Sequence, residues 1–151
     1  MKKQKCSNVP SGRGRRALLI DLDNVLLQSG QWVQPDEGAR RLRAIRECAG
    51  GVHHTLAVAP HRSVRRWASE LAAVDISWAE VPPGPDSADH TISLIADELV
   101  AHGYTELCIA SGDHYFAPLA ERVRLVVIDP GGHALSHELY RVASEVYSLA
   151  A

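Results

Sequence analysis

Short apolar runs alternate with helical segments along most of the chain, and this alternation is the feature that most limits the fold. Five runs of strand length follow one another, and each is separated from the next by a segment with helical periodicity. These runs are residues 17–21, 54–60, 76–81, 106–111 and 124–129. Strands that alternate with helices form a parallel sheet covered on both faces. The sequence therefore predicts an α/β fold, a three-layer α/β/α sandwich with about five parallel strands.

The segments between these runs carry start and stop signals of helices. Pro35 lies near the start of the segment 35–50, and Gly50 follows its last apolar turn. Ser63 is expected to cap the next helix. In the segment 88–103, apolar residues recur at helical spacing. With right-handed crossovers, helices in these places give the strand order 3-2-1-4-5, numbered along the chain.

The chain is expected to be one folded domain with a basic arm. Its 151 residues suffice for a single core. Of its 16 basic residues, six lie among the first 16 positions, where no acidic residue occurs. Residues 1–15 are predicted to be a disordered arm, which either contacts phosphates or only solubilises the protein. Residues 16–151 are predicted to be the folded domain, ending in a helix and a short strand over 136–149.

The cysteines and the hydropathy pattern narrow the class of protein. The three cysteines are widely spaced and form no CxxC pair, which argues against a disulfide framework and a thiolate zinc site. Cys108, within an apolar run, is interpreted as a core residue. No apolar run approaches the roughly 20 residues needed to span a bilayer, and no secretory signal is evident. We expect a cytoplasmic protein that does not enter a membrane.

Acidic residues follow the runs that topology makes neighbours. Asp21 ends the first run, Asp113 follows the fourth, and Asp89 lies in the first turn of the helix between the third and fourth. In the order 3-2-1-4-5 the first and fourth strands are adjacent, and ligands bind outside the carboxyl ends of strands at such a switch point. The sequence therefore predicts that the three carboxylates line one crevice. Alternatively, Asp89 and Asp113 only stabilise helix N-termini.

A divalent cation is the simplest compensation for such a group. Two carboxylates about 4 Å apart repel by roughly 4 kcal/mol at an effective dielectric constant near 20. All three lysines precede residue 6, so no lysine of the folded domain neutralises these charges. Mg²⁺ and Mn²⁺ prefer oxygen ligands and often use one or two carboxylates together with a phosphate. We therefore expect Mg²⁺ or Mn²⁺ as the cofactor.

Three motifs, in order and with their spacing, resemble those of the NYN domain, a branch of the PIN-like nucleases. They are LLIDLDNV (18–25), GPDSADHTI (84–92) and ASGDHYFAPL (110–119). The resemblance covers roughly residues 16–148, and the C-terminal segment is similar to that of actinobacterial members. It implies a PIN-like fold and a metal-dependent ribonuclease that hydrolyses single-stranded RNA.

The resemblance also assigns roles to individual residues. It implies that Asp21, Asp89 and Asp113 bind the metal and that Asn24 matches the asparagine that follows the first acid. The chain departs from the family at Tyr115, where many relatives have a second aspartate. A different function is therefore kept open, that of a catalytically weak or inactive RNA-binding or regulatory module.

Further polar residues are candidates for contact with RNA. Ser111 and His114 adjoin Asp113, and arginines cluster on the first two predicted helices. These arginines either contact phosphates or form solvated helix faces. Trp32 either stacks on a base or plugs the core. The candidate substrate-binding residues are Ser111, His114, Arg40, Arg41, Arg62 and Arg65.

A third interpretation concerns the first motif alone. DLDNVLL also resembles the nucleophile motif of haloacid dehalogenase-like phosphatases, with Asp21 as nucleophile and Asp23 as general acid/base. Ala117 stands where the paired acid of that family's last motif is expected, and the folded domain has no lysine for its cationic role. Asp97 is expected to be a surface residue. A homodimer is possible because related nucleases often pair.

Overall fold

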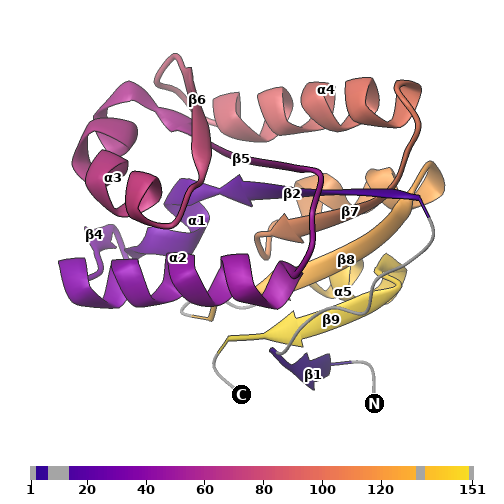
Figure 1. Ribbon diagram of the computed structural model, residues 1–151, viewed down its shortest axis with the longest axis horizontal. Coiled ribbons are helices and arrows are strands. Elements are labelled where there is room, and N and C mark those ends of the chain that lie inside the picture. Colours follow the sequence, from indigo (N-terminus) through magenta and orange to yellow (C-terminus); the bar gives the residue numbers. More distant parts are fainter. Residues whose placement is uncertain (1–2, 7–13, 132–134, 150–151) are drawn as a thin grey trace.

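Most of the described chain is organised around one parallel sheet (Figure 1). The computed structural model describes residues 3–6, 14–131 and 135–149, and within them the sheet has seven strands that all pair in parallel. From one edge to the other these are β1 (Lys3–Lys5), β9 (Glu145–Ser148), β8 (Arg124–Asp129), β7 (Tyr104–Ala110), β2 (Arg15–Asp21), β5 (His54–Pro60) and β6 (Ser77–Val81). The order β6-β5-β2-β7-β8 confirms the predicted 3-2-1-4-5.

The sheet has seven strands rather than about five because two short strands extend it beyond β8. β9 is the predicted last strand. β1 corrects the prediction of a disordered arm for Lys3–Lys5, which pair with residues 146–148 of β9. Lys3 Nζ also lies 2.7 Å from Asp129 Oδ2 at the end of β8. β1 is polar and exposed, and backbone pairing and one ion pair hold it in place. Its sequence therefore contains no apolar run from which a strand could be predicted. The rest of the predicted arm falls largely outside the described residues.

One disulfide corrects the expectation that the cysteines are unpaired. Cys6, directly after β1, is bonded to Cys48 near the end of the first long helix. Forty-two positions separate the two residues, so only the folded chain brings them together. Cys108 is a free, fully buried cysteine on β7, which confirms its interpretation as a core residue.

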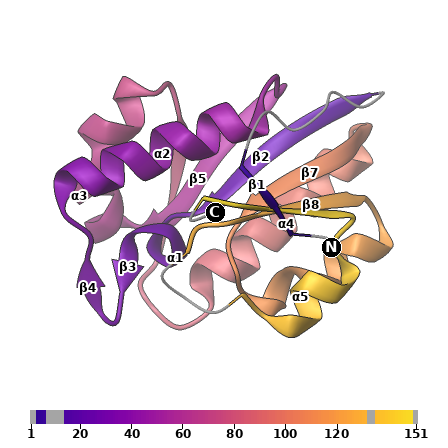
Figure 2. The same cartoon turned by 90° about the horizontal axis from the view of Figure 1, so that it is seen from below.

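Helices cover both faces of the sheet (Figure 2). On one face lie α2 (Pro35–Ala49) and α3 (His61–Ala73), and on the other α4 (Ser87–Ala101), the 3₁₀ helix η1 (His114–Glu121) and α5 (His137–Val142). Each face has its own apolar core. The three-layer α/β/α architecture is therefore confirmed. None of the helices in the described ranges is both long and apolar enough to cross a membrane.

Two local features differ from the sequence prediction. α3 begins at His61, directly after Pro60, so Ser63 lies inside the helix rather than capping it. Pro60 ends β5 with a fixed backbone angle that also suits a helix start. After β2, the chain forms a short helix and a small hairpin that were not predicted. These are α1 (Leu22–Leu26), β3 (Leu27–Gln28) and β4 (Gln31–Trp32).

Candidate functional site

The alternation of side chains along β2 decides which face receives Asp21. Ile20 packs in the core under α2 and α3, whereas Leu19 packs in the core under α4. Because successive strand residues point to opposite faces, Asp21 follows Leu19 and points toward α4. There its carboxyl group hydrogen-bonds to that of Asp89, in the first turn of α4.

The predicted carboxylates meet in one cavity of about 380 Å³ outside the carboxyl ends of β2 and β7. We call it the acidic cavity, because five aspartates line it. Among the described residues, none of those in its wall is a lysine or an arginine. The prediction that three distant acids share a crevice is thus confirmed, whereas their role as metal ligands stays a prediction. The lining residues are Asp21, Asp23, Asn24, Leu27, Gly30, Pro60, Gly84, Asp86, Ala88, Asp89 and Asp113.

Hydrogen bonds fix the turn after β7 against the end of β2. Ser111 Oγ donates to Asp21 Oδ2 at 3.1 Å, and the Gly112 amide donates to Asn24 Oδ1 at 3.1 Å. The Asp113 amide in turn donates to Ser111 Oγ at 3.2 Å. These hydrogen bonds therefore fix the position of the turn after β7 relative to the end of β2. Asn24 acts as the bridge between the two motifs.

Ser111 does not have the position expected of a substrate-binding residue. Its side chain is completely buried and its hydroxyl group is engaged by Asp21 and by the turn. Ser111 directly follows the last residue of β7, Ala110, and its side chain faces Asp21 rather than the solvent. The structure therefore corrects the prediction, and Ser111 positions Asp21 instead of contacting a ligand.

The electrostatics of the acidic cavity favour proton retention by two of its acids. Burial raises the pKa of Asp21 to about 8, and the neighbouring charges of Asp89, Asp113 and Asp23 add to the effect, while the Ser111 hydrogen bond opposes it. The pKa of Asp89 is raised to about 6, first by burial and then by Asp113 and Asp86. Burial and mutual repulsion therefore make the ionised form of these carboxyl groups, Asp21 above all, costly to the folded chain.

Asp86 is the acid that the sequence interpretation left out. It occupies the position before α4 with a left-handed backbone (φ 62°), which aspartate tolerates better than most residues. Its place three residues before Asp89, at a helix start, is the signal that points to it. Asp23, which has a role only in the phosphatase interpretation of the sequence, also lines the acidic cavity.

The donor set suits a hard divalent cation. Carboxylate oxygens are the ligands that Mg²⁺ and Mn²⁺ prefer, and the raised pKa values of Asp21 and Asp89 show that protein cations do not compensate them. In residues 3–6, 14–131 and 135–149, no three His, Cys, Asp or Glu side chains already stand in a metal-holding arrangement. Side-chain rotation is therefore needed for these acids to bind one ion.

The arginine candidates fall into two groups. Arg41 is buried, and its guanidinium group donates to the Val25 carbonyl oxygen at 2.8 Å and to Glu37 at 2.9 Å. This corrects its assignment to RNA contact, because a buried arginine that ties α2 to α1 cannot reach a phosphate. Arg40 is exposed, but both of its hydrogen bonds go to Glu37. Arg62 and Arg65 are exposed on α3.

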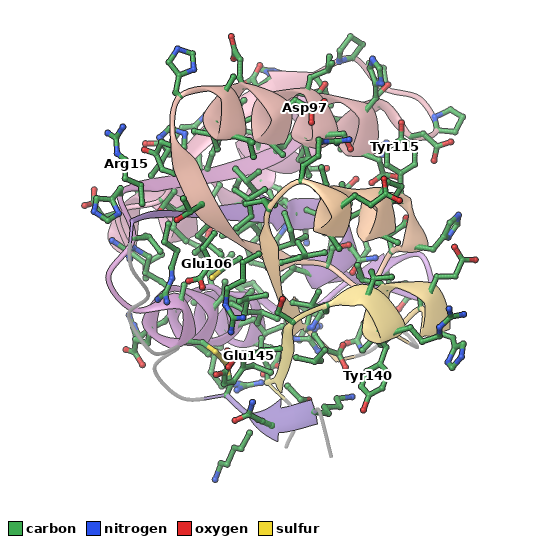
Figure 3. The ribbon with its side chains drawn as sticks, turned by 90° about the vertical axis from the view of Figure 1, so that its right-hand side faces the viewer. Arg15, Asp97, Glu106, Tyr115, Tyr140 and Glu145 are labelled. Atoms are coloured by element: carbon green, nitrogen blue, oxygen red, sulfur yellow. A yellow bond between two sulfur atoms is a disulfide. The ribbon has the colours of Figure 1, made fainter. Side chains whose placement is uncertain are left out.

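The residues around η1 are partly available to a ligand. His114 is exposed, and its Nδ1 lies 3.4 Å from Asp113 Oδ1; its role in substrate binding stays a prediction. Tyr115 donates its amide to Asp113 Oδ1 at 2.9 Å while its ring packs edge-on against Phe116. Figure 3 shows Tyr115 on η1 and Asp97 on α4. Asp97 pairs with Arg122 at the surface, as expected.

Trp32 has the position of a core plug. Its ring lies edge-on to Trp67 with a centroid distance of 6.1 Å, and the Arg66 guanidinium group covers it at 5.6 Å. Trp67 itself packs so closely on α2 that a Cβ atom at Gly38 would lie 2.2 Å from its ring. These contacts occupy the ring of Trp32 and favour the structural interpretation over base stacking.

Comparisons with known proteins place the chain in a family and identify a similar structure. The profile of the NYN domain matches residues 15–146. The crystal structure of a protein of unknown function, VPA0982 from Vibrio parahaemolyticus RIMD 2210633, has a similar fold. Its sequence is 19% identical, the match covers 93% of this chain and 96% of that chain, and the TM-score is 0.66. A search of curated proteins gives no match.

Proposed function

Because this chain belongs to the NYN domain family, we propose that it is a ribonuclease that hydrolyses phosphodiester bonds of single-stranded RNA with Mg²⁺ or Mn²⁺. The observation that carries this proposal is the acidic cavity. Three motif acids, Asp21, Asp89 and Asp113, come from distant segments and line it together. Their charges are costly to the fold, and a site for cations and phosphates accounts for that cost.

Each of the motif residues has a distinct part in this proposal. Asp21, Asp89 and Asp113 hold the ion, and Asp86 adds negative charge beside them. The chemistry supplied by such an ion is Lewis acidity toward water and toward the oxygens of a phosphodiester. Ser111 keeps Asp21 oriented through its hydrogen bond, and it lowers the pKa of that carboxyl group. Asn24 holds the turn that carries Asp113.

A second candidate function is an RNA-binding module without turnover. The ring of Tyr115 packs against Phe116, so a side chain that many relatives devote to the site here belongs to the core. A cavity with one acid fewer still attracts a cation, and a cation held there can bind an RNA phosphate. The phosphatase alternative has less support, since Ala117 stands where the paired acid of that family's last motif is expected and the folded domain has no lysine for its cationic role.

Cleavage of labelled single-stranded RNA tests the proposal. We expect cleavage with Mn²⁺ or Mg²⁺, no cleavage in EDTA, and loss of cleavage in Asp113→Asn. The matched control is Asp97→Asn, which makes the same chemical change at a surface ion pair and is expected to cleave normally. RNA that wild-type protein binds but does not cleave, even with Mn²⁺, identifies the module instead. Release of phosphate from p-nitrophenyl phosphate, with labelling of Asp21, identifies the phosphatase.

A further inference from the structure

A second cavity, of about 510 Å³, adjoins the acidic cavity. Its wall consists of Asp23, Pro60, His61, Arg62, Pro83 and Gly84. Three of these residues, Asp23, Pro60 and Gly84, also line the acidic cavity, so the two spaces share one wall. The volume lies within the range of about 300–1,000 Å³ that is typical of small-molecule sites. A linear ligand that extends from the acidic cavity past these three residues therefore enters the second cavity.

The second cavity differs from the first in its chemistry. Its prolines offer apolar surface, and a cationic side chain, Arg62, lines it. Arg62 is exposed and forms no ion pair with any residue in the described ranges, whereas Arg40 and Arg41 are held by Glu37. His61 also lines the cavity, with Nδ1 2.8 Å from Glu80 Oε2. Apolar walls beside a free guanidinium group suit a nucleoside joined to a phosphate.

The shared wall carries an acceptor without a donor. Asp23 Oδ1 is buried and has no hydrogen-bond partner among the described residues. A buried acceptor that stays unpaired costs about 1–3 kcal/mol, and Asp23 also raises the pKa of Asp21. Because this oxygen is buried, the carboxylate must turn about its Cβ–Cγ bond to meet a hydroxyl group from the cavity, and that hydrogen bond would relieve the deficit. In an RNA strand that spans two cavities, the group that lies between base and phosphate is the ribose, with its 2′-hydroxyl.

We propose that the second cavity binds the ribonucleotide next to the scissile phosphodiester. Its base packs against Pro60 and Pro83, Arg62 contacts its distal phosphate, and Asp23 accepts a hydrogen bond from the 2′-hydroxyl. This inference rests on the proposed function, since the acidic cavity is taken to hold the scissile phosphodiester. It adds a binding subsite and a means of telling RNA from DNA.

Binding in EDTA tests the subsite independently of cleavage. Fluorescence anisotropy of a labelled single-stranded RNA is measured with wild type, Arg62→Ala and Arg43→Ala. Arg43 is an exposed arginine on α2 that lies in neither cavity wall, so its replacement is the matched control. We expect Arg62→Ala alone to weaken binding, by about 5-fold, and to lower the slope of log Kd against log salt by about 0.7. Equal affinity of the two variants, or no RNA binding by wild type, overturns the subsite.

Single 2′-deoxy substitutions test the role of Asp23. The cut in a short RNA is mapped, and the nucleotide on either side of it is replaced by its deoxy form. We expect wild type to lose about 10-fold in kcat/KM at one of the two positions. Asp23→Ala should cut ribo- and deoxy-substituted strands equally, and Asp23→Asn, which keeps a carbonyl acceptor, should restore part of the preference. A wild type that ignores both substitutions, or an Asp23→Ala that keeps the preference, contradicts the assignment.

Failure of the subsite and failure of the proposed function give different results. If wild type cleaves RNA while neither Arg62→Ala nor the deoxy substitutions matter, the nuclease stands and the subsite is wrong. If wild type never cleaves, the deoxy comparison is made by anisotropy in EDTA, with the same expected loss and the same variants. In that case the binding subsite survives only if Arg62→Ala and the deoxy strand both bind more weakly.

Discussion

Asp21 and Glu106 are buried to nearly the same degree, with 5% and 6% of their surfaces exposed, but they lie at opposite ends of the central sheet. Glu106, near the amino end of β7, is paired with Arg16 and accepts from Arg124 Nε at 2.9 Å. Arg124 also reaches Glu145, 3.3 Å away. Figure 3 shows Glu106 and Glu145 near each other at this end. Asp21, at the carboxyl end of β2, faces other aspartates instead.

The comparison teaches that burial alone does not identify a functional carboxylate. At the amino end, arginines from β2 and β8 compensate the charge, and a buried pair of this kind is a structural element. At the carboxyl end, the described lining residues include five aspartates and no lysine or arginine. The same fold thus neutralises one buried acid within the chain and leaves the other without a lysine or arginine in the described wall of its cavity. Because only one of the two buried acids is compensated by arginines, mutations at the two ends of the sheet should have different effects.

The largest expected effect comes from Asp21→Asn, which should change activity and stability in opposite directions. We expect cleavage of RNA to fall by about 1,000-fold, because the change removes a carboxylate that is proposed to bind the metal ion. In EDTA at pH 7, the free energy of unfolding should rise by about 2 kcal/mol, since an amide carries no charge to be buried among aspartates. Cleavage rates and urea denaturation measure the two quantities. An Asp21→Asn protein that is less stable than wild type in EDTA would remove the basis of the comparison.

Glu106→Ala should give the opposite pattern. Removal of this carboxylate leaves the buried Arg16 guanidinium group without its partner, and such a loss costs about 3 kcal/mol of stability. Cleavage per folded molecule should stay near the wild-type value, because the acidic cavity lies at the other end of the sheet. Urea denaturation checks the stability, and Glu121→Ala, at an exposed position on η1, is the control. If Glu106→Ala were as stable as wild type, Arg16 and Arg124 would not compensate the charge of Glu106 as described.

The arrangement of the central strands could be predicted because it follows from local pattern and chain handedness. Alternating strands and helices with right-handed crossovers leave few topologies, and this alone predicts Asp21 beside Asp113. β1 could not be predicted in this way. Lys3–Lys5 is polar, and what holds it are backbone pairing with β9, an ion pair with Asp129 and the bond from Cys6 to Cys48. These are contacts between residues distant in sequence.

Positions of individual side chains in the site were predicted less well than the site itself. Arg41 was expected at the surface, but a carbonyl oxygen of α1, which the sequence did not reveal as a helix, draws it inward. Ser111 was expected to contact the substrate because it adjoins Asp113. Its orientation depends on strand alternation at the last residues before a turn, where a boundary error of one residue reverses the face. Motif spacing therefore locates a site, and packing decides which of its residues are accessible.

A smaller effect is expected in the pH dependence of stability without metal. The pKa values of Asp21 and Asp89 are raised to about 8 and about 6, from an ordinary value of 3.8. At these two groups the folded protein binds protons more tightly than the unfolded chain, so their contribution to stability is fully present below about pH 4 and is lost as pH rises toward 8. We expect a contribution of about 1–2 kcal/mol, measured by urea denaturation in EDTA. Asp21→Asn should remove the part of this dependence that belongs to Asp21, and an equal pH dependence of wild type and Asp21→Asn contradicts the assignment.

The smallest effect is expected from Ser111→Ala, which tests positioning within the acidic cavity. The hydroxyl group of Ser111 donates to Asp21 and opposes the rise in its pKa, so its loss should raise that pKa further. We expect about 10-fold slower cleavage at pH 7, equivalent to about 1.4 kcal/mol, with partial recovery at higher pH as the carboxyl group ionises. Ser63→Ala is a matched control, because Ser63 is equally buried and its hydroxyl group has no partner in the described chain. Ser111→Ala could instead lower the cleavage rate equally at all pH values, without a shift of the pH–rate profile to higher pH. That result would mean that Ser111 only supports the turn and does not affect the charge of Asp21.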